Sequence, residues 1–268
     1  MTALSAILEY GGRRMQVSLD EPLDISIPIV PGEMGVNCFY APPPEAWPVE
    51  AGSFIGDTTR GGSVNFFNLR LVPHGNGTHT ECVGHISSKR YSINQCLRRF
   101  HFLAKLITVY PRKRENGDRV VMREDIEQAL RPGEAEALIL RTMPNDELKR
   151  KTNYSGANPP FIDVEAMRYL VRCGIDHFLT DLPSVDREED GGALAAHKAF
   201  WKYPDAIREQ CTISELIYVP SSISDGLYLL NLQIASLELD VSPSKPVLYV
   251  LNLGVWGEGP SWRSQQVQ

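Results

Sequence analysis

The order of apolar segments along the chain restricts its fold more strongly than any other feature. Strand-like apolar runs occur at residues 102–110, 135–142, 175–180, 211–219, 230–237 and 246–253. Helical segments lie between them at residues 124–130 and 193–201, and a third runs from the N-cap residue Asp163 to the stop signal Gly174. Strands that alternate with helices predict an α/β or mixed α+β fold with a sizeable sheet. No linker-like boundary interrupts this pattern, so we expect one domain over residues 1–268.

The segment before these strands has a different character. Residues 30–62 are rich in proline and glycine, which disfavour regular strand pairing and permit unusual dihedrals, so we expect a long ordered loop. Long loops in compact domains are often functional. Arg60 lies in this loop, and its guanidinium is suited to binding a substrate carboxylate; a surface or ion-paired arginine is at least as good an interpretation. The mostly apolar residues 64–72 then predict a largely buried strand.

That strand leads into a short window with a high density of histidine. His74, His79 and His85 are half of the six histidines in the chain, and Glu81 lies among them. Imidazole and carboxylate are preferred ligands of borderline divalent cations such as Zn²⁺ and Mn²⁺. If residues 79–85 are extended, the side chains at 79, 81 and 85 share one face, because the strand period is two. The window therefore predicts half of a metal site; the alternative is a polar loop whose histidines are satisfied by hydrogen bonds.

Charge and hydropathy exclude several classes of function. The net charge is −6 and no basic run is longer than Arg112-Lys113-Arg114, so we expect no nucleic-acid partner. No window approaches the roughly 20 apolar residues that cross a bilayer, and the amino terminus lacks a signal-peptide pattern, so we expect no membrane partner. The five cysteines are odd in number and include no CxxC pair, which favours a reduced, cytoplasmic protein without structural disulfides.

Donors from later in the chain are needed as well, because one short loop seldom supplies a complete catalytic site. His197 lies among alanines on a predicted helix, and Glu215 lies in an apolar strand between Ile213 and Ile217. A buried carboxylate is costly unless it is paired or binds a cation. Taken separately, a partly exposed helical histidine and a solvent-facing strand glutamate are equally good interpretations of these two residues.

Taken together, these residues resemble the cyclase family of metal-dependent hydrolases, which includes the bacterial kynurenine formamidases and the isatin hydrolases. The family motif is His-x-Gly-Thr-His-x-Asp-x-Pro-x-His, and residues 74–85 read His-Gly-Asn-Gly-Thr-His-Thr-Glu-Cys-Val-Gly-His. Residues 180–186, Thr-Asp-Leu-Pro-Ser-Val-Asp, are also similar to the family. Three positions depart from the motif: His74 precedes His79 by five residues rather than four, Glu81 replaces the aspartate, and Val83 replaces the proline.

The resemblance implies a mixed, strongly curved β-sheet flanked by helices, the kynurenine formamidase-like fold, assembled as a homodimer or homotetramer. It also implies one or two divalent metal ions, zinc or manganese, in each subunit. The metal-binding positions of the family correspond to His74, His79, Glu81 and His197. Glu215 corresponds to a distal glutamate that helps complete the site, and His85 to a histidine that acts in proton transfer, so we expect catalytic roles for these two.

The resulting hypothesis is an enzyme that hydrolyses a C–N bond of a small non-peptide amide, such as an arylformamide, or of a cyclic amide, or a related ester. A divalent ion lowers the pKa of its bound water from 15.7 toward ~7, and an imidazole such as that of His85 then exchanges protons with the water and the leaving group. Two alternatives stay open. One is a non-catalytic metal-binding or assembly protein on the same scaffold. The other is a lyase or cyclase, because a polarised carbonyl also serves dehydration or ring closure.

Overall fold

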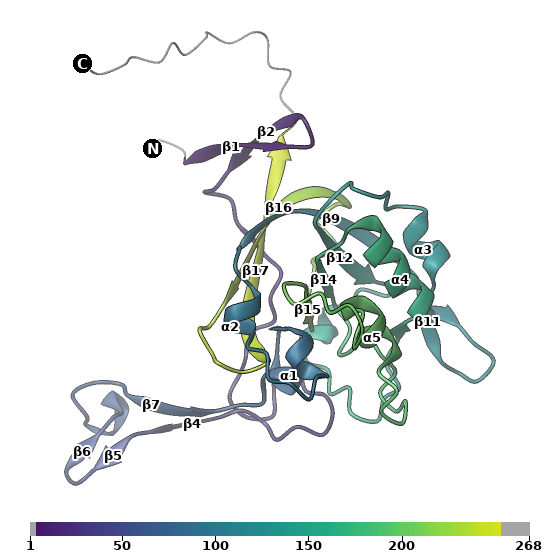
Figure 1. The fold of residues 1–268 in the computed structure, drawn as a ribbon. Helices are drawn as coiled ribbons and strands as arrows, with labels where there is room; N and C mark the ends of the chain where they lie inside the picture. The colour runs from purple at the N-terminus through teal and green to yellow at the C-terminus, as the bar shows by residue number, and fades with distance from the viewer. Residues whose placement is uncertain (1–3, 253–268) are drawn as a thin grey trace, which may run out of the picture.

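A curved mixed sheet forms the body of the protein. The computed structural model describes residues 4–252, and its largest sheet has ten strands in the order β1-β2-β17-β16-β9-β12-β14-β15-β8, with β3 added beside β17. β17 also pairs with β8, which closes seven of these strands into a barrel-like ring (Figure 1). The ring consists of β8 (His79–Glu81), β9 (His101–Val109), β12 (Ala137–Thr142), β14 (His177–Thr180), β15 (Thr212–Glu215), β16 (Gly226–Ile234) and β17 (Val241–Asn252).

The middle of the ring is parallel and buried on both faces. β9, β12, β14 and β15 are parallel neighbours, and every residue of β12 is buried. Leu138 packs in one core cluster with residues of the helices, whereas Ile139 packs in a second cluster with residues of β16 and β17. Burial on both faces explains why these segments are continuous apolar runs in the sequence rather than alternating ones.

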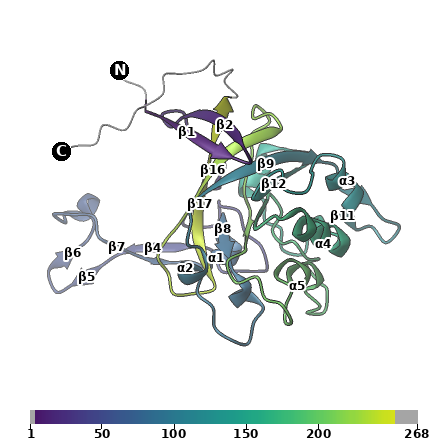
Figure 2. The same cartoon turned by 45° about the horizontal axis from the view of Figure 1, so that its top comes forward.

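Three helices cover one side of this ring (Figures 1 and 2). They are α3 (Arg123–Glu127), α4 (Val164–Cys173) and α5 (Ala195–Trp201). The predicted ends of α4 are confirmed, because the Asp163 side chain accepts a hydrogen bond from the Glu165 N–H, and Gly174 ends the helix in a left-handed conformation with φ of 82°. Met167 and Leu170 of this helix pack into the first core cluster, which fixes α4 against the sheet.

The remaining elements are short. A hairpin of β1 (Ser5–Tyr10) and β2 (Arg13–Ser18) extends the sheet beyond the end of β17, and β3 is Leu23–Asp24. The other elements of the body are α1 (Pro73–Asn76), the 3-10 turn η2 (Val83–His85), α2 (Ile93–Cys96), β10 (Arg112–Lys113), β11 (Arg119–Val121), the 3-10 helix η3 (Glu147–Lys151) and β13 (Phe161–Ile162). The strand expected at residues 246–253 is confirmed in β17, except that position 253 lies outside the described residues.

A two-stranded arm projects from the body instead of the expected loop and buried strand (Figure 1). The arm consists of β4 (Glu45–Pro48), β5 (Glu50–Ala51), β6 (Phe54–Ile55), η1 (Thr58–Arg60) and β7 (Phe67–Arg70). β7 pairs only with β4 in the described chain, and Phe66 and Leu69 are 56% and 59% exposed. The prediction of a largely buried strand at 64–72 is therefore wrong. Apolar character predicts burial in general, but this ribbon leaves the body that would cover it.

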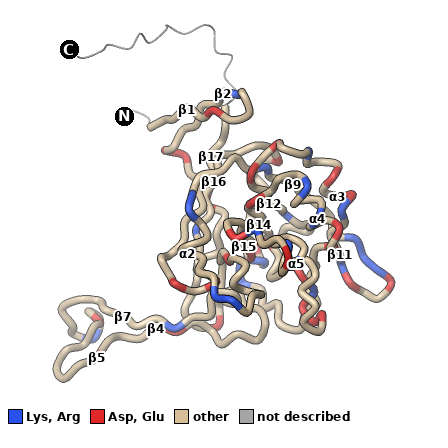
Figure 3. The backbone as a smooth tube through the Cα atoms, in the orientation of Figure 1, with Lys and Arg blue, Asp and Glu red and all other residues tan. Residues whose placement is uncertain are grey.

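Charged residues of both signs are distributed over the described part of the chain. Lys and Arg are interspersed with Asp and Glu along the backbone (Figure 3). None of the helices within residues 4–252 has the length and apolar character required to cross a bilayer. The five cysteines, all within the described residues, are buried and unpaired.

Candidate metal centre

The centre is built on the antiparallel pairing of β8 with β15. Glu215 lies directly opposite His79 in this register, and Ile213 lies opposite Glu81. His79 and Glu81 point to the same face because they are two residues apart in a strand, as predicted. The Nε2 atom of His79 lies 3.3 Å from Oε2 of Glu215, and both side chains are buried. The interpretation of Glu215 as a solvent-facing strand residue is therefore wrong.

A backbone carbonyl orients the ring of His79. Nδ1 of His79 lies 2.9 Å from the carbonyl oxygen of Gly77, which can only accept a hydrogen bond, so Nδ1 carries a proton. In the neutral ring, Nε2 then has a free lone pair directed at the carboxylates. Gly77 itself is required here, because a Cβ at this position would lie 2.7 Å from Cγ1 of Ile29.

A buried aspartate orients His197 on α5. The Asp186 carboxylate accepts hydrogen bonds from Nδ1 of His197, at 2.6 Å, and from the backbone N–H groups of Ala196 and His197. This leaves Nε2 of His197 3.1 Å from Oε1 of Glu81 and 3.8 Å from Oε1 of Glu215. Both predicted distal residues thus meet the histidine window, and His197 is buried rather than partly exposed. Carboxylates that hold a ring in this way are typical partners of metal-binding histidines.

His74 and His85 come from the segments before and after β8, and their rings lie side by side against Glu81, with centroids 4.5 Å apart. His74 lies on the single turn of α1, and its Nε2 is 3.4 Å from Oε2 of Glu81. His85 lies on η2, with Nδ1 3.6 Å from the same oxygen. The expectation that residues 79–85 are extended is wrong, because β8 ends at Glu81 and the chain turns at Gly84, where a Cβ would lie 2.4 Å from the Tyr91 carbonyl oxygen.

One residue of the cluster was missed in the sequence. Oδ2 of Asp240 lies 3.2 Å from Nε2 of His74 and 3.6 Å from Nδ1 of His85. Asp240 directly precedes β17, and the pairing of Val241 with Glu81 brings it to the site (Figure 2). A carboxylate at the start of an apolar strand is a common pattern, so the only signal in the sequence was weak.

The structure does not bring Arg60 to this cluster. Arg60 ends η1 on the arm, and its Nη1 donates a hydrogen bond to Oε1 of Glu50 at 2.6 Å. The side chain of Arg60 is about half exposed. Within one chain, the structure shows Arg60 paired with Glu50 on the arm, which projects from the body (Figure 1), and the substrate-clamp interpretation stays a prediction.

Protonated histidines offset the negative charge of the carboxylates in this cluster. Burial by itself lowers the pKa of His197, but Asp186 and Glu81 outweigh it and raise that pKa to about 10. Burial likewise opposes the effect of Asp240 and Glu81 on His74, whose pKa they raise to about 10. Burial raises the pKa of Glu81, yet the neighbouring histidines hold it well below its usual range. A divalent cation would replace these protons, so its binding would release them.

The residues present fit a divalent cation. Three atoms of the cluster, Nε2 of His74, Nε2 of His79 and Oε2 of Glu81, are buried without a hydrogen-bond partner in the described chain. The donor atoms form two groups, and within each group they lie within 4.8 Å of one another. One group is His74, Glu81 and His85, and the other is His79, Glu81 and Glu215, so Glu81 belongs to both. Imidazole and carboxylate donors suit Zn²⁺ and Mn²⁺.

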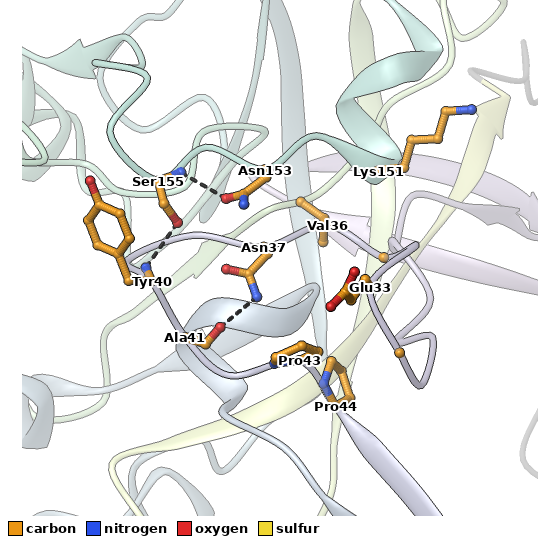
Figure 4. A pocket seen from close by; sticks show the side chains of 12 residues that line it. Glu33, Val36, Asn37, Tyr40, Ala41, Pro43, Pro44, Lys151, Asn153 and Ser155 are labelled. Atoms are coloured by element: carbon orange, nitrogen blue, oxygen red, sulfur yellow. Dashed lines mark hydrogen bonds between the residues drawn. The ribbon is translucent and has the colours of Figure 1, made fainter.

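A cavity of about 480 Å³ lies next to the centre but is not part of it (Figure 4). Its walls come from residues 32–44 and 151–155, and include Asn37, Tyr40 and Asn153. Cys38, which follows Asn37, contacts the backbone of α1, with Sγ 3.3 Å from the carbonyl oxygen of His74. None of the residues that line the cavity belongs to the metal cluster.

The curved mixed sheet thus carries a buried cluster of histidine and carboxylate side chains that could hold a metal ion. Residues 23–187 match the family model Cyclase, described as "Putative cyclase". The chain belongs to this cyclase family, as the motif predicted. No curated protein matches this sequence.

Solved structures agree with the family in fold. A potential metal-dependent hydrolase with cyclase activity is 16% identical with a TM-score of 0.61, covering 86% of this chain and 98% of that chain. Isatin hydrolase A from Labrenzia aggregata is 16% identical with a TM-score of 0.58, covering 86% of this chain and 93% of that chain. Isatin hydrolase A from Ralstonia solanacearum is 13% identical with a TM-score of 0.61, covering 86% and 92%. At these identities the likeness concerns the fold.

Proposed function

We propose that the protein is a divalent-metal-dependent hydrolase that cleaves a C–N bond of a small non-peptide amide or cyclic amide, or a related ester. Arylformamides, from the resemblance, and isatin, from the named structural neighbours, are the first substrates to test. The observation that carries this proposal is the pair of buried, unpartnered donor atoms, Nε2 of His79 and Oε2 of Glu81, facing further carboxylate and imidazole groups.

In this proposal four buried side chains hold the ion: His79, Glu81, His197 and Glu215. A bound zinc or manganese ion supplies an activated water near neutral pH and polarises the scissile carbonyl. The chain's own contribution is to fix the donors. The Gly77 carbonyl and the Asp186 carboxylate each occupy one ring nitrogen of a ligand histidine, so that the other nitrogen faces the centre.

The exposed side of the cluster is where a substrate enters. The side chains of His74 and His85 are 25% and 30% exposed, whereas those of His79 and Glu81 are fully buried. His85 therefore stands where it meets both substrate and solvent. An imidazole at this position would accept a proton from the attacking water and donate it to the leaving nitrogen, because imidazole serves as both a base and an acid.

The test combines metal analysis with turnover. Protein stripped with a chelator is reloaded with Zn²⁺ or Mn²⁺, and the metal content and hydrolysis of an arylformamide and of isatin are measured. We expect His79→Ala to lose the ion and to reduce turnover by at least about 100-fold. His101→Ala, which changes an exposed histidine on β9, is the matched control.

Product mass separates the alternatives, because hydrolysis adds one water to the substrate whereas a lyase or a cyclase that dehydrates removes it. Wild-type protein that binds no ion, with unchanged behaviour of His79→Ala, would contradict the proposal and favour a non-catalytic binding or assembly protein.

We also propose a homodimer or homotetramer in the cytoplasm. The arm carries exposed apolar side chains, and an isolated two-stranded ribbon is at best marginally stable in water, so a second copy of the chain is the natural cover for it. The five unpaired cysteines support a reducing compartment.

A further inference from the structure

A side-chain hydroxyl connects β8 and β15 just beyond the point where their backbone pairing stops. The ladder between these strands ends at the pair His79 and Glu215. Thr78 directly precedes His79, and Leu216 directly follows Glu215. Oγ1 of Thr78 donates a hydrogen bond to the carbonyl oxygen of Leu216 and accepts one from the N–H of Ile27 at 2.7 Å. Both hydrogen bonds are buried, so the one proton of the hydroxyl is committed to Leu216.

Leu216 has a backbone conformation that leucine rarely adopts. Its φ is 53°, in the left-handed region, where the Cβ atom is crowded by the backbone. Its side chain is completely buried. Among the non-glycine residues with positive φ in the described chain, only Leu216 adjoins a donor residue of the candidate metal centre. Residues persist in such a conformation only where their surroundings hold them, and they are concentrated at functional sites.

The turn at Leu216 ends β15 and joins it to a third segment, residues 180–186. The N–H of Leu216 donates a hydrogen bond to the carbonyl oxygen of Leu182 at 3.0 Å. The N–H of Ile217 donates to the carbonyl oxygen of Thr180 at 3.1 Å. Leu216 is therefore held at both of its backbone polar groups, by Leu182 at the N–H and by Thr78 at the carbonyl oxygen.

The same third segment holds the Glu215 carboxylate. Oε1 of Glu215 accepts a hydrogen bond from the N–H of Val185 at 2.9 Å, which leaves Oε2 3.3 Å from Nε2 of His79. This division of the two oxygens depends on where the backbone of Glu215 lies between β8 and Val185. Leu216 shares a peptide group with Glu215, so relaxation of Leu216 toward negative φ would move the carboxylate away from His79.

We propose that Thr78 is a positioning residue of the metal centre: its hydroxyl holds Leu216 in the left-handed conformation and so keeps the Glu215 carboxylate at its distance from His79. This inference rests on the proposed function, because it takes Glu215 and His79 as ligands of one ion. It has two separable parts. The hydroxyl of Thr78 is required, rather than the size of the side chain, and it acts through the backbone of Leu216.

Metal affinity tests the role of the hydroxyl. Full-length protein is stripped with a chelator, and Zn²⁺ affinity is measured by competition with a chromophoric chelator. Thr78→Val keeps the shape of the side chain without the hydroxyl, and we expect it to lower the affinity about 10–100-fold. Thr78→Ser keeps the hydroxyl and is expected to restore the affinity. Thr212→Val is the matched control, because it removes another buried hydroxyl from β15, one that lies 2.9 Å from Nδ1 of His177.

A pair of double variants tests the path through Leu216. Leu216→Gly and Leu216→Ala both remove the buried side chain, but only glycine adopts the left-handed conformation without steric cost. Combined with Thr78→Val, Leu216→Gly is expected to recover most of the lost affinity, whereas Leu216→Ala is not. The visible spectrum of the Co²⁺-loaded proteins reports the coordination geometry and is expected to follow the same order. If Thr78→Val alone does not fold, recovery of folding by Leu216→Gly but not by Leu216→Ala supports the same path.

The outcomes separate this inference from the proposed function. Unchanged affinity in Thr78→Val overturns the positioning role. Equal losses in Thr78→Val and Thr78→Ser overturn the requirement for the hydroxyl, and equal affinities of the two double variants overturn the path through Leu216. In each of these cases the wild type still binds its ion, so the proposed function stands. A wild type that binds no ion contradicts both.

Discussion

Glu215 lies directly opposite His79 across the antiparallel pair of β8 and β15, with Oε2 of the one 3.3 Å from Nε2 of the other. On the opposite face of the same two strands, the hydroxyl groups of Thr80 and Ser214 lie 2.7 Å apart. Both contacts depend on the same strand register, because a slip of one residue would move every side chain to the opposite face of the sheet. The buried hydroxyl pair thus belongs to the same register that brings the carboxylate to the imidazole.

The first prediction concerns this hydroxyl pair. Thr80→Val removes one partner and leaves the buried Ser214 hydroxyl without the other, so we expect a loss of about 1–3 kcal/mol in unfolding free energy. The double variant Thr80→Val with Ser214→Ala removes both polar groups and is expected to be less destabilised than the sum of the single variants. Urea unfolding of the four proteins measures this. Strictly additive losses would show that the two hydroxyls do not interact.

The second prediction concerns the partner of His197. Asp186→Asn keeps the shape of the side chain but weakens its hydrogen bond to Nδ1 of His197, so we expect affinity for the proposed metal ion to fall about 10–100-fold. Competition with a chromophoric chelator measures this affinity. Asp163→Asn, which keeps an N-cap residue on α4, is the control. An unchanged dissociation constant for Asp186→Asn would show that His197 is oriented without it.

The third prediction concerns pH and a histidine outside the centre. Burial lowers the pKa of His177 to about 4, against about 6.5 in an unfolded chain. As pH falls from 6.5 toward 4, the unfolded chain binds a proton that the folded protein does not, so folding loses up to about 3 kcal/mol from this group. Above pH 6.5 this contribution to stability is fully present.

His177→Gln lacks this titration, so its unfolding free energy should fall less over the same pH range. Urea titrations in chelator, from pH 7 to pH 4, compare the two proteins without any effect of metal release. Parallel curves for the wild type and His177→Gln would refute the prediction.

The fourth prediction concerns the arm. Phe67→Asp places a charge on its exposed apolar surface, so we expect the proposed dimer or tetramer to dissociate. Light scattering coupled to gel filtration measures the mass of the particle. Tyr110→Asp, an exposed aromatic position on the body, is the control and should keep the assembly. A wild-type protein with the mass of a monomer, or a Phe67→Asp variant with the same mass as the wild-type assembly, would show that the arm is not the interface.

The sequence predicted features that depend on neighbours along the chain. The ends of α4 follow from Asp163 and Gly174, whose capping geometry is local. The shared face of His79 and Glu81 follows from the period of a strand. Even the departures of the motif at His74 and Glu81 did not obscure the cluster, because one turn of α1 still brings Nε2 of His74 to 3.4 Å from Oε2 of Glu81.

Features that depend on pairing between distant segments could not be predicted from the sequence. Nothing in the residues around Asp240 indicates that β17 pairs with β8, and this pairing alone brings the carboxylate to His74. The apolar residues of β7 predict burial equally well in a body strand or on an arm, and only the course of the chain distinguishes them.

The sequence by itself was therefore enough to predict the family, the strand that carries His79 and Glu81, and the type of donor atom at the centre. Tertiary structure alone decided that the site has a further carboxylate in Asp240 and that Arg60 lies away from it within one chain. The physical reason is that capping and strand period act over a few residues, whereas the closure of a sheet depends on the packing of the whole core.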